Sequence, residues 1–181
     1  MNTEAGSLRL ATEADIPALN ALIATSVRQL QRGHYSHAQR EAAIGLVFGV
    51  DSQLIRDGTY YVVEQGGALV GCGGWSRRRT TCGADNARDR DDALLDPAID
   101  SARIRAFFVD PAWSRRGIAR MIMEASERAL TEAGFRSVEI AATLPGVPFY
   151  TSFGCEVAEY YEIPLRGADP LAMARMTKRY D

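Results

Sequence analysis

Residues 103–134 combine a strand, a loop and a helix, and this order limits the folds open to the chain. The first part, residues 104–109, is apolar and alternates until Phe107 and Phe108 place two large side chains next to each other. A two-residue period that slips by one residue predicts a β-bulge, which leaves backbone groups unpaired and redirects side chains. Asp110–Pro111 ends the strand, because proline has no N–H for a neighbouring strand.

The second part of this stretch predicts a helix. Apolar residues recur there at helical spacing, at Ile118, Ile122, Ala125 and Ala129. Gly134 stands where a left-handed residue would close the helix. A further strand over residues 137–142 follows, and the order strand–helix–strand predicts a right-handed parallel crossover.

The loop between strand and helix reads Ser114-Arg115-Arg116-Gly117-Ile118-Ala119. A helix N-terminus presents unpaired N–H groups and partial positive charge, and Gly117 lets a ligand approach the backbone closely. Arg115 and Arg116 add charged phosphate donors, so the loop predicts a pyrophosphate cradle. The loop is neither a Walker A sequence nor a GxGxxG fingerprint. The alternative is an ordinary helix start with solvated arginines and an incidental glycine.

The stretch VDPAWSRRGIA resembles motif A of the GCN5-related N-acetyltransferases (GNAT), a strand followed by Gln/Arg-x-x-Gly-x-Gly/Ala before a helix. Gly117 and Ala119 match its last two defined positions, whereas Ser114 stands where the family usually has Gln or Arg. The segment PFYTSFGC resembles motif B. The resemblance spans most of the chain, with both motifs in the family's order and spacing.

The resemblance implies an α/β (α+β) fold in one domain over residues 1–181. Its core is a GNAT-like mixed, mostly antiparallel seven-stranded sheet with helices on both faces. The two central parallel strands, residues 104–109 and 138–142, are expected to splay apart so that a pantetheine arm pairs with the exposed backbone.

The resemblance also implies acetyl-CoA as co-substrate and a small-molecule or protein amine as acceptor. The family's motifs place the cofactor on nine residues: Phe107, Phe108, Val109, Arg115, Arg116, Gly117, Ile118, Ala119 and Arg120. Tyr150 matches the motif-B tyrosine and is the expected general acid, since a phenol with a pKa of about 10 keeps its proton at neutral pH. The alternative for Tyr150 is a core tyrosine whose hydroxyl bonds to backbone. The Val109 N–H is the expected oxyanion donor by family analogy.

The general base stays open among Glu64, Asp110 and Glu139, because spacing singles out none of them. The acceptor candidates are His34 and Tyr35 in the sequence RGHYSH, and Trp75 at the end of a strand. Packing of these aromatic side chains on the sheet or in the core is the competing interpretation for Tyr35 and Trp75.

The remaining elements follow from local patterns. Residues 16–30 predict a helix whose apolar face carries Ile16, Leu19, Ile23 and Leu30. Ser36 and Gln39 predict a capping box for a second helix that runs to about Phe48. Residues 59–64 and 68–76 predict a hairpin around Gly66–Gly67, and its second strand contains glycines that indicate a bulge or a close backbone approach: Gly71, Gly73 and Gly74.

Residues 77–101 are charged and poor in large apolar groups. They predict a long, partly mobile excursion between strands, which we expect to be dispensable for the fold.

Composition narrows the function further. The net charge of −2 gives no basic field for nucleic acid. Three cysteines show neither metal spacing nor an even disulfide count, so we expect no metal and a reducing cytoplasm. The N-terminal sequence does not resemble a signal peptide, and no apolar stretch is long enough for a bilayer. The oligomeric state stays open, with a homodimer among the alternatives.

Two further functions compete with N-acetyl transfer by direct attack in a ternary complex. A non-catalytic acyl-CoA-binding or sensing module needs the same cradle but not Tyr150, so the presence of Tyr150 favours the enzyme. A nucleotide-binding domain ranks below both, because the chain lacks the glycine pattern and the acidic residue that binds ribose.

Overall fold

The computed structural model describes residues 6–87 and 90–181. Seven strands form one sheet in the order β1-β2-β3-β4-β5-β7-β6. Every neighbouring pair is antiparallel except β4 and β5, which are parallel, so the predicted mixed sheet is confirmed. The strands are β1 (Ser7–Leu10), β2 (Tyr60–Gln65), β3 (Ala68–Ser76), β4 (Ala102–Val109), β5 (Ser137–Thr143), β6 (Glu156–Ile163) and β7 (Leu171–Arg179).

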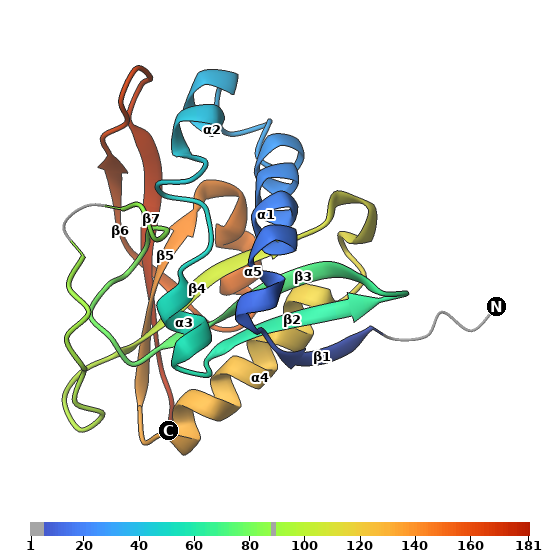
Figure 1. Cartoon of the computed structure of the whole chain (residues 1–181). Helices are drawn as coiled ribbons and strands as arrows, with labels where there is room; N and C mark the ends of the chain where they lie inside the picture. Colours follow the sequence, from blue (N-terminus) through green and yellow to red (C-terminus); the bar gives the residue numbers. More distant parts are fainter. Residues whose placement is uncertain (1–5, 88–89) are drawn as a thin grey trace.

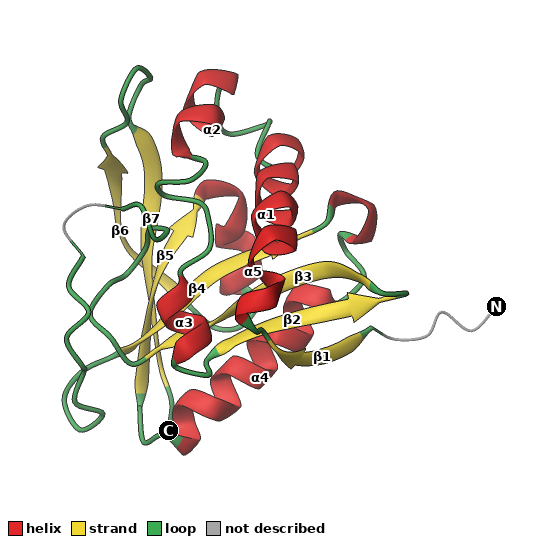
Figure 2. Ribbon diagram, in the orientation of Figure 1, coloured by secondary structure: helices red, strands yellow, loops and turns green. Residues whose placement is uncertain are grey.

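Helices cover both faces of this sheet (Figures 1 and 2). On one face, α1 packs its buried stripe against residues of β2, β3 and β4; on the other, α4 packs against β3 and β4. The helices are α1 (Ile16–Leu30), α2 (His37–Ala43), α3 (Ser52–Arg56), α4 (Ile118–Glu132) and α5 (Val147–Thr151), with single 3-10 turns η1 (Glu13–Asp15), η2 (Pro111–Trp113) and η3 (Leu144–Gly146). Within the described residues, no helix is long and apolar enough to cross a bilayer.

The glycines of β3 let other elements approach its backbone closely. A Cβ on Gly71 would lie 2.3 Å from Cγ2 of Ile118 at the start of α4, and one on Gly73 would lie 2.6 Å from the Phe107 ring. A Cβ on Gly74 would lie 2.1 Å from the Thr59 carbonyl oxygen. Real Cβ atoms do not approach neighbours this closely, so the predicted close approach is confirmed at all three glycines.

The predicted bulge in β4 is present, one residue earlier than the sequence pattern indicates. Arg105 pairs with Gly74 and Phe108 with Cys72, so both Ala106 and Phe107 lie opposite the single residue Gly73. Ala106 adopts φ of 54°, which is uncommon for a residue with a side chain. The Tyr60 hydroxyl donates to the Ala106 carbonyl oxygen at 2.8 Å, and this bond holds the bulge.

The parallel strands β4 and β5 part halfway along their length. Their pairing covers three positions and ends where Ile104 lies opposite Ile140. Beyond that point β4 continues to Val109 beside β3, while β5 continues to Thr143 beside β7. The predicted splay of the central pair is therefore confirmed.

Glycines mark both ends of α4. Gly117 is the N-cap residue with φ of 83°, and Gly134 follows the helix with φ of 94°. The Phe135 N–H donates to the Leu130 carbonyl at 3.1 Å and the Gly134 N–H to Thr131 at 3.0 Å, which is a Schellman closure. Both boundaries predicted from the sequence are confirmed.

Two predictions for the first helices need correction. The second helix ends at Ala43 rather than near Phe48, because Gly45 adopts φ of 84° and its N–H turns back to the Phe48 carbonyl at 2.7 Å. Leu30 is 41% exposed, so it does not belong to the buried stripe of α1. After Ile23, the buried stripe of α1 continues at intervals of four residues through Val27 to Gln31.

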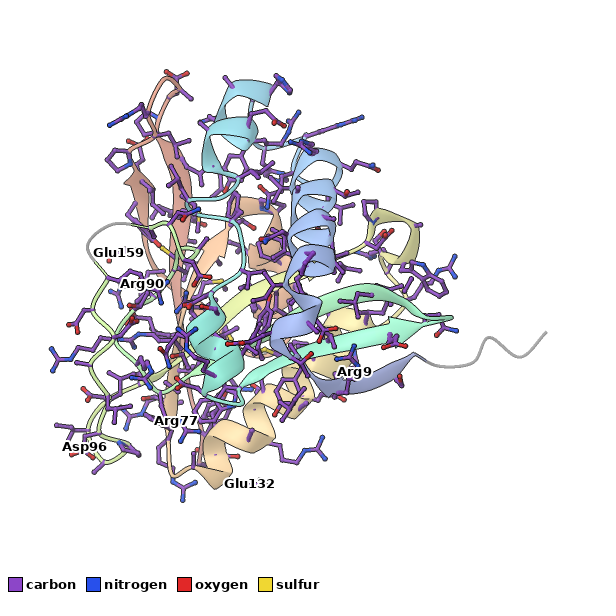
Figure 3. The ribbon with its side chains drawn as sticks, viewed as in Figure 1. Arg9, Arg77, Arg90, Asp96, Glu132 and Glu159 are labelled. Carbon is purple, nitrogen blue, oxygen red and sulfur yellow. The ribbon has the colours of Figure 1, made fainter. Side chains whose placement is uncertain are left out.

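The segment between β3 and β4 packs against the domain. Arg78 binds Asp57 of the α3 end with two bonds of 2.7 and 2.8 Å. Arg90, labelled in Figure 3, donates to Asp51 at 2.9 Å. Leu95 is buried among residues of the α4 face. These contacts remove the basis for expecting the segment to be dispensable.

Candidate active site

A cavity of about 700 Å³ opens where β4 and β5 separate. Its lining comes from distant parts of the chain: α1, the turn after α2, the segment before β4, the bulge, the loop before α4, the end of β5, α5 and β7. Eight of the nine predicted cofactor residues line it: Phe107, Phe108, Val109, Arg115, Gly117, Ile118, Ala119 and Arg120. The ninth, Arg116, is outside the lining, and its guanidinium lies 4.8 Å from the centre of the ring of Trp113, which is a lining residue.

The loop before α4 offers free backbone donors to this cavity. The first main-chain bond of α4 runs from the Met121 N–H to the Gly117 carbonyl at 3.0 Å. The amides of Ile118, Ala119 and Arg120 precede it and therefore have no acceptor within the helix. A Cβ placed on Gly117 would meet nothing within 4 Å, and Ile118, Ala119 and Arg120 all line the cavity. This geometry fits a phosphate group.

Charged side chains surround the same helix end. Arg115 is exposed, lines the cavity and adopts φ of 65°. The Arg120 guanidinium lies 5.2 Å from the centre of the Phe153 ring and 3.8 Å from Glu124. Ile118 is buried with its side chain against Gly71, so only its backbone can serve a ligand. The loop thus combines open amides with mobile positive charge.

The splayed end of β4 directs one amide away from β3. The Asp110 N–H donates to the Val70 carbonyl of β3 at 2.9 Å. Successive residues of a strand direct their N–H groups to opposite edges. The Val109 N–H therefore points toward β5, on the side where pairing between the two strands has ended.

Tyr150 lies on α5 at the edge of this opening. Its side chain is buried, lines the cavity, and packs edge-on against the rings of Phe107 and Phe149 at centroid distances of 6.1 and 5.1 Å. Burial, with a smaller contribution from the nearby Cys155, raises the pKa of Tyr150 above its ordinary value. None of the described residues hydrogen-bonds its hydroxyl, in contrast to the backbone-bonded core tyrosine considered above.

The three carboxylates considered as general bases lie elsewhere. Glu64 binds Arg9 at 3.1 Å, Glu139 lies 3.7 Å from Arg175, and Asp110 accepts from the Ala112 N–H at 2.8 Å. None of them lines the cavity. Among the described lining residues there is no Asp, Glu or His at all.

The structure does not bring the three acceptor candidates to the cavity. Tyr35 is 3% exposed; its hydroxyl donates to the Ala172 carbonyl at 2.7 Å and accepts from the Leu144 N–H at 2.9 Å. Trp75 is buried against Phe135, and His34 is an exposed loop residue outside the lining. The packing interpretation therefore holds for Tyr35 and Trp75.

Several lining residues escaped the sequence analysis. Gln31 and Arg105 are buried polar residues in the cavity wall, and residues 81–83 bring the segment before β4 into it. Gln31 carries a local signal, because it continues the i, i+4 stripe of Ile23 and Val27. Residues 81–83 carry none, since only long-range contacts place them there.

Comparison with protein-family models matches residues 56–156 to the acetyltransferase (GNAT) domain. The match covers more than half of the chain, so the chain belongs to the GNAT acetyltransferase family. A search of curated proteins finds no match.

Solved structures share the fold over almost the whole chain. A GCN5-related N-acetyltransferase from Rhodopseudomonas palustris is 20% identical with a TM-score of 0.72, over 99% of this chain and 98% of that one. The PaiA N-acetyltransferase from Thermoplasma acidophilum, in complex with coenzyme A, is 12% identical with a TM-score of 0.61, over 96% and 98%. YncA from Salmonella typhimurium, with its cofactor acetyl-CoA, is 14% identical with a TM-score of 0.64, over 97% and 94%.

Proposed function

We propose that this protein is an acetyl-CoA-dependent N-acetyltransferase in which an amine attacks directly within a ternary complex. The observation that carries the proposal is the meeting of three features in one cavity: the unpaired backbone of splayed β4, the open amides before α4, and Tyr150. The complexes of structural neighbours with coenzyme A and acetyl-CoA support the same co-substrate here.

The residues present fit coenzyme A. The open amides of Ile118, Ala119 and Arg120 would hold its pyrophosphate, with Arg115 supplying charge. The free edge of β4 would hold its pantetheine arm by main-chain bonds, as in strand addition. When bound, acetyl-CoA supplies an activated acetyl thioester, which an amine converts to an amide with release of the thiol.

Two groups of the chain assist this conversion. The Val109 N–H, directed into the opening, would stabilise negative charge on the acetyl oxygen. The Tyr150 hydroxyl would give a proton to the departing sulfur, and its raised pKa keeps that proton in place at neutral pH. The hydroxyl makes no bond to a described residue, so it can turn toward the sulfur without losing a partner.

The described residues of the cavity lining include no base of the usual kind for the amine. Because the described lining has no carboxylate or imidazole, the acceptor must lose its proton to water, either in solution or through the mouth of the cavity. Positioning of the two reactants then supplies much of the rate acceleration, since it can lower the activation free energy by roughly 7–11 kcal/mol at best. A cytoplasmic setting suits the three free thiols, Cys72, Cys82 and Cys155.

The test is an assay of free thiol release from acetyl-CoA across a panel of amines, with product masses as the second readout. Release that depends on an amine and yields the acetylated amine supports the enzyme. Tight acetyl-CoA binding without turnover of any amine would replace the proposal with the acyl-CoA-binding module.

A further inference from the structure

We propose that the acceptor is an amine with an uncharged, largely apolar body, and that Gln31 positions it. The inference rests on the proposed N-acetyltransferase function and concerns the part of the cavity away from the cradle. This part, called the acceptor wall, consists of Gln31, Phe48, residues 81–83, Arg105 and Met173, all of which line the cavity.

Specific contacts join several of the five segments that form the acceptor wall. The Ala84 N–H donates to the Leu46 carbonyl at 2.8 Å, which joins the segment before β4 to the turn after α2. The rings of Phe48 and Phe108 meet edge-on at 5.9 Å. Arg105 donates to the carbonyls of Thr80 and Gly83, each at 3.0 Å, and so fixes the backbone of residues 81–83.

The charged groups at the acceptor wall are already paired with one another before any ligand enters: Arg105 and Arg90 share Asp51, and Arg90 also donates to Asp92 at 3.2 Å. Arg105 is 2% exposed and donates to Asp51 at 2.9 Å. Asp51 is 1% exposed, lies outside the lining, and also binds Arg90, so its charge is not offered to the cavity. The other charged lining residues, Arg115 and Arg120, are positive and belong to the cradle.

This pairing selects against acceptors that carry further ammonium groups. A second ammonium on the acceptor wall would find no described carboxylate in the lining and would face the Arg105 guanidinium. Desolvating such a charge without a partner is costly. Phe48 and Met173 of the acceptor wall, together with the lining residues Leu30 and Val47, instead offer apolar surface, which suits an aliphatic or aromatic body.

Gln31 supplies the polar contact that orients such an acceptor. The residue is 6% exposed, and its side-chain oxygen Oε1 is buried with no hydrogen-bond partner among the described residues. Buried polar atoms in proteins almost always have a partner, and leaving one unpaired is costly. Gln31 lines the cavity, so a turn of its side chain toward the cavity would let Oε1 accept an N–H of a bound acceptor and hold the nitrogen in one orientation.

The first test compares acceptors of different charge at fixed, saturating acetyl-CoA. We expect kcat/KM for 2-phenylethylamine and hexylamine to exceed that for spermidine and kanamycin by at least about tenfold, equivalent to about 1.4 kcal/mol. A preference for spermidine or kanamycin would overturn this inference and leave the N-acetyltransferase proposal intact. Absence of turnover with every amine would overturn both.

The second test uses matched substitutions of two glutamines. Gln31→Glu places a negative charge on the acceptor wall and should shift the ratio of kcat/KM values toward spermidine. Gln65→Glu makes the same change at the end of β2, outside the cavity lining, and should leave the ratio unchanged. An equal shift in both variants, or none in Gln31→Glu with acetyl-CoA affinity and melting temperature preserved, would contradict the assignment.

A neutral variant covers the case in which Gln31→Glu does not fold. Gln31→Leu removes the hydrogen-bonding group at similar size. It should raise KM for 2-phenylethylamine about 2- to 12-fold, the range expected for one hydrogen bond, while KM for acetyl-CoA stays as in the wild type. Unchanged amine kinetics in Gln31→Leu would remove Gln31 from the proposal.

Discussion

Tyr150 combines two properties that a core tyrosine seldom has together. Its ring is held by Phe107 and Phe149, so its position is fixed. Its hydroxyl has no hydrogen-bond partner among the described residues, although buried tyrosine hydroxyls usually find one. A fixed ring with a free hydroxyl is what a proton donor to a ligand requires.

We predict that Tyr150→Phe lowers kcat by roughly 10²–10⁴-fold and leaves acetyl-CoA affinity nearly unchanged. The substitution keeps the ring contacts and removes only the hydroxyl. Melting temperature measured on the same preparation should stay close to wild type, because no described hydrogen bond is lost. A wild-type kcat would end the assignment of Tyr150 as the acid.

The pH dependence of acceptor use follows from the same cavity. We predict that kcat/KM for an amine rises with pH up to the pKa of that amine, because the described lining holds no carboxylate or imidazole to act as its base. Burial raises the pKa of Tyr150 above about 10, so the acid form persists and activity should fall only above that pH.

Two amines that differ mainly in basicity provide the check. In a plot of kcat/KM against pH, the rise for 2,2-difluoro-2-phenylethylamine should occur at lower pH than the rise for 2-phenylethylamine, because fluorine makes the amine less basic. An inflection at one shared pH for both amines would show that a group of the enzyme accepts the proton.

At the scale of elements, the loop before α4 makes a specific prediction for cofactor binding. Gly117→Trp should weaken CoA binding by at least about tenfold in calorimetry, equivalent to about 1.4 kcal/mol, because the new side chain fills the space before the amides. Gly167→Trp is the matched control. Gly167 also has a positive φ, of 76°, and open space around it, but it lies outside the cavity lining.

The control separates occupation of the phosphate position from backbone strain. Both variants place a side chain at a left-handed residue and should lose similar stability. Unchanged CoA affinity in Gly117→Trp, or an equal loss in Gly167→Trp, would remove the cradle from the binding model.

At the scale of the whole molecule, the segment before β4 closes the domain around the cavity. We predict that replacing residues 78–100 with a short Gly/Ser linker lowers the melting temperature substantially. The replacement removes Arg90, Leu95 and the carbonyls bound by Arg105, so the buried Arg105–Asp51 pair loses Arg90 and the carbonyls of Thr80 and Gly83. Removing one partner from a buried ion pair commonly costs about 3–5 kcal/mol, and here Asp51 loses Arg90.

A point substitution in the same segment serves as the comparison. Ile99 is 83% exposed, so Ile99→Ser should leave unfolding as in the wild type. Retention of the wild-type melting temperature after replacement of residues 78–100 would restore the expectation that the segment is dispensable.

The range over which residues contact each other also explains which parts of the fold and site could be predicted from the sequence alone. The strand, loop and helix around the cradle were predictable because their signals are local: a slipped alternation at Phe107 and Phe108, and glycines that adopt positive φ at Gly117 and Gly134. The seven-stranded sheet followed from the family resemblance together with these motifs. Eight of the nine residues predicted to bind the cofactor therefore line one cavity, and their role in binding stays a prediction.

The acceptor side was not predictable in the same way. Arg105 and Asp51 are 54 positions apart, and Asp57 and Arg78 are 21 apart, so no short-range pattern reveals either pair. The short helix α3 was missed because five residues are too few to show periodicity. Charge-rich composition predicted a long, partly mobile excursion over residues 77–101. In the structure Arg78 and Arg90 of this segment bind Asp57 and Asp51, and the mobility of the segment stays a prediction.

The early end of pairing between β4 and β5 has a mechanical consequence. Three paired positions connect a half-sheet of β1 to β4 with a second half-sheet of β5, β7 and β6. A ligand arm that bonds to the free edge of β4 while packing beside β5 would bridge this short seam and stiffen it. We predict that CoA slows hydrogen exchange at backbone amides of both strands beyond the seam, residues 105–109 and 141–143, and raises the melting temperature with concentration. Protection confined to the loop before α4 would show that CoA is anchored by its phosphates alone and that the two half-sheets still move independently.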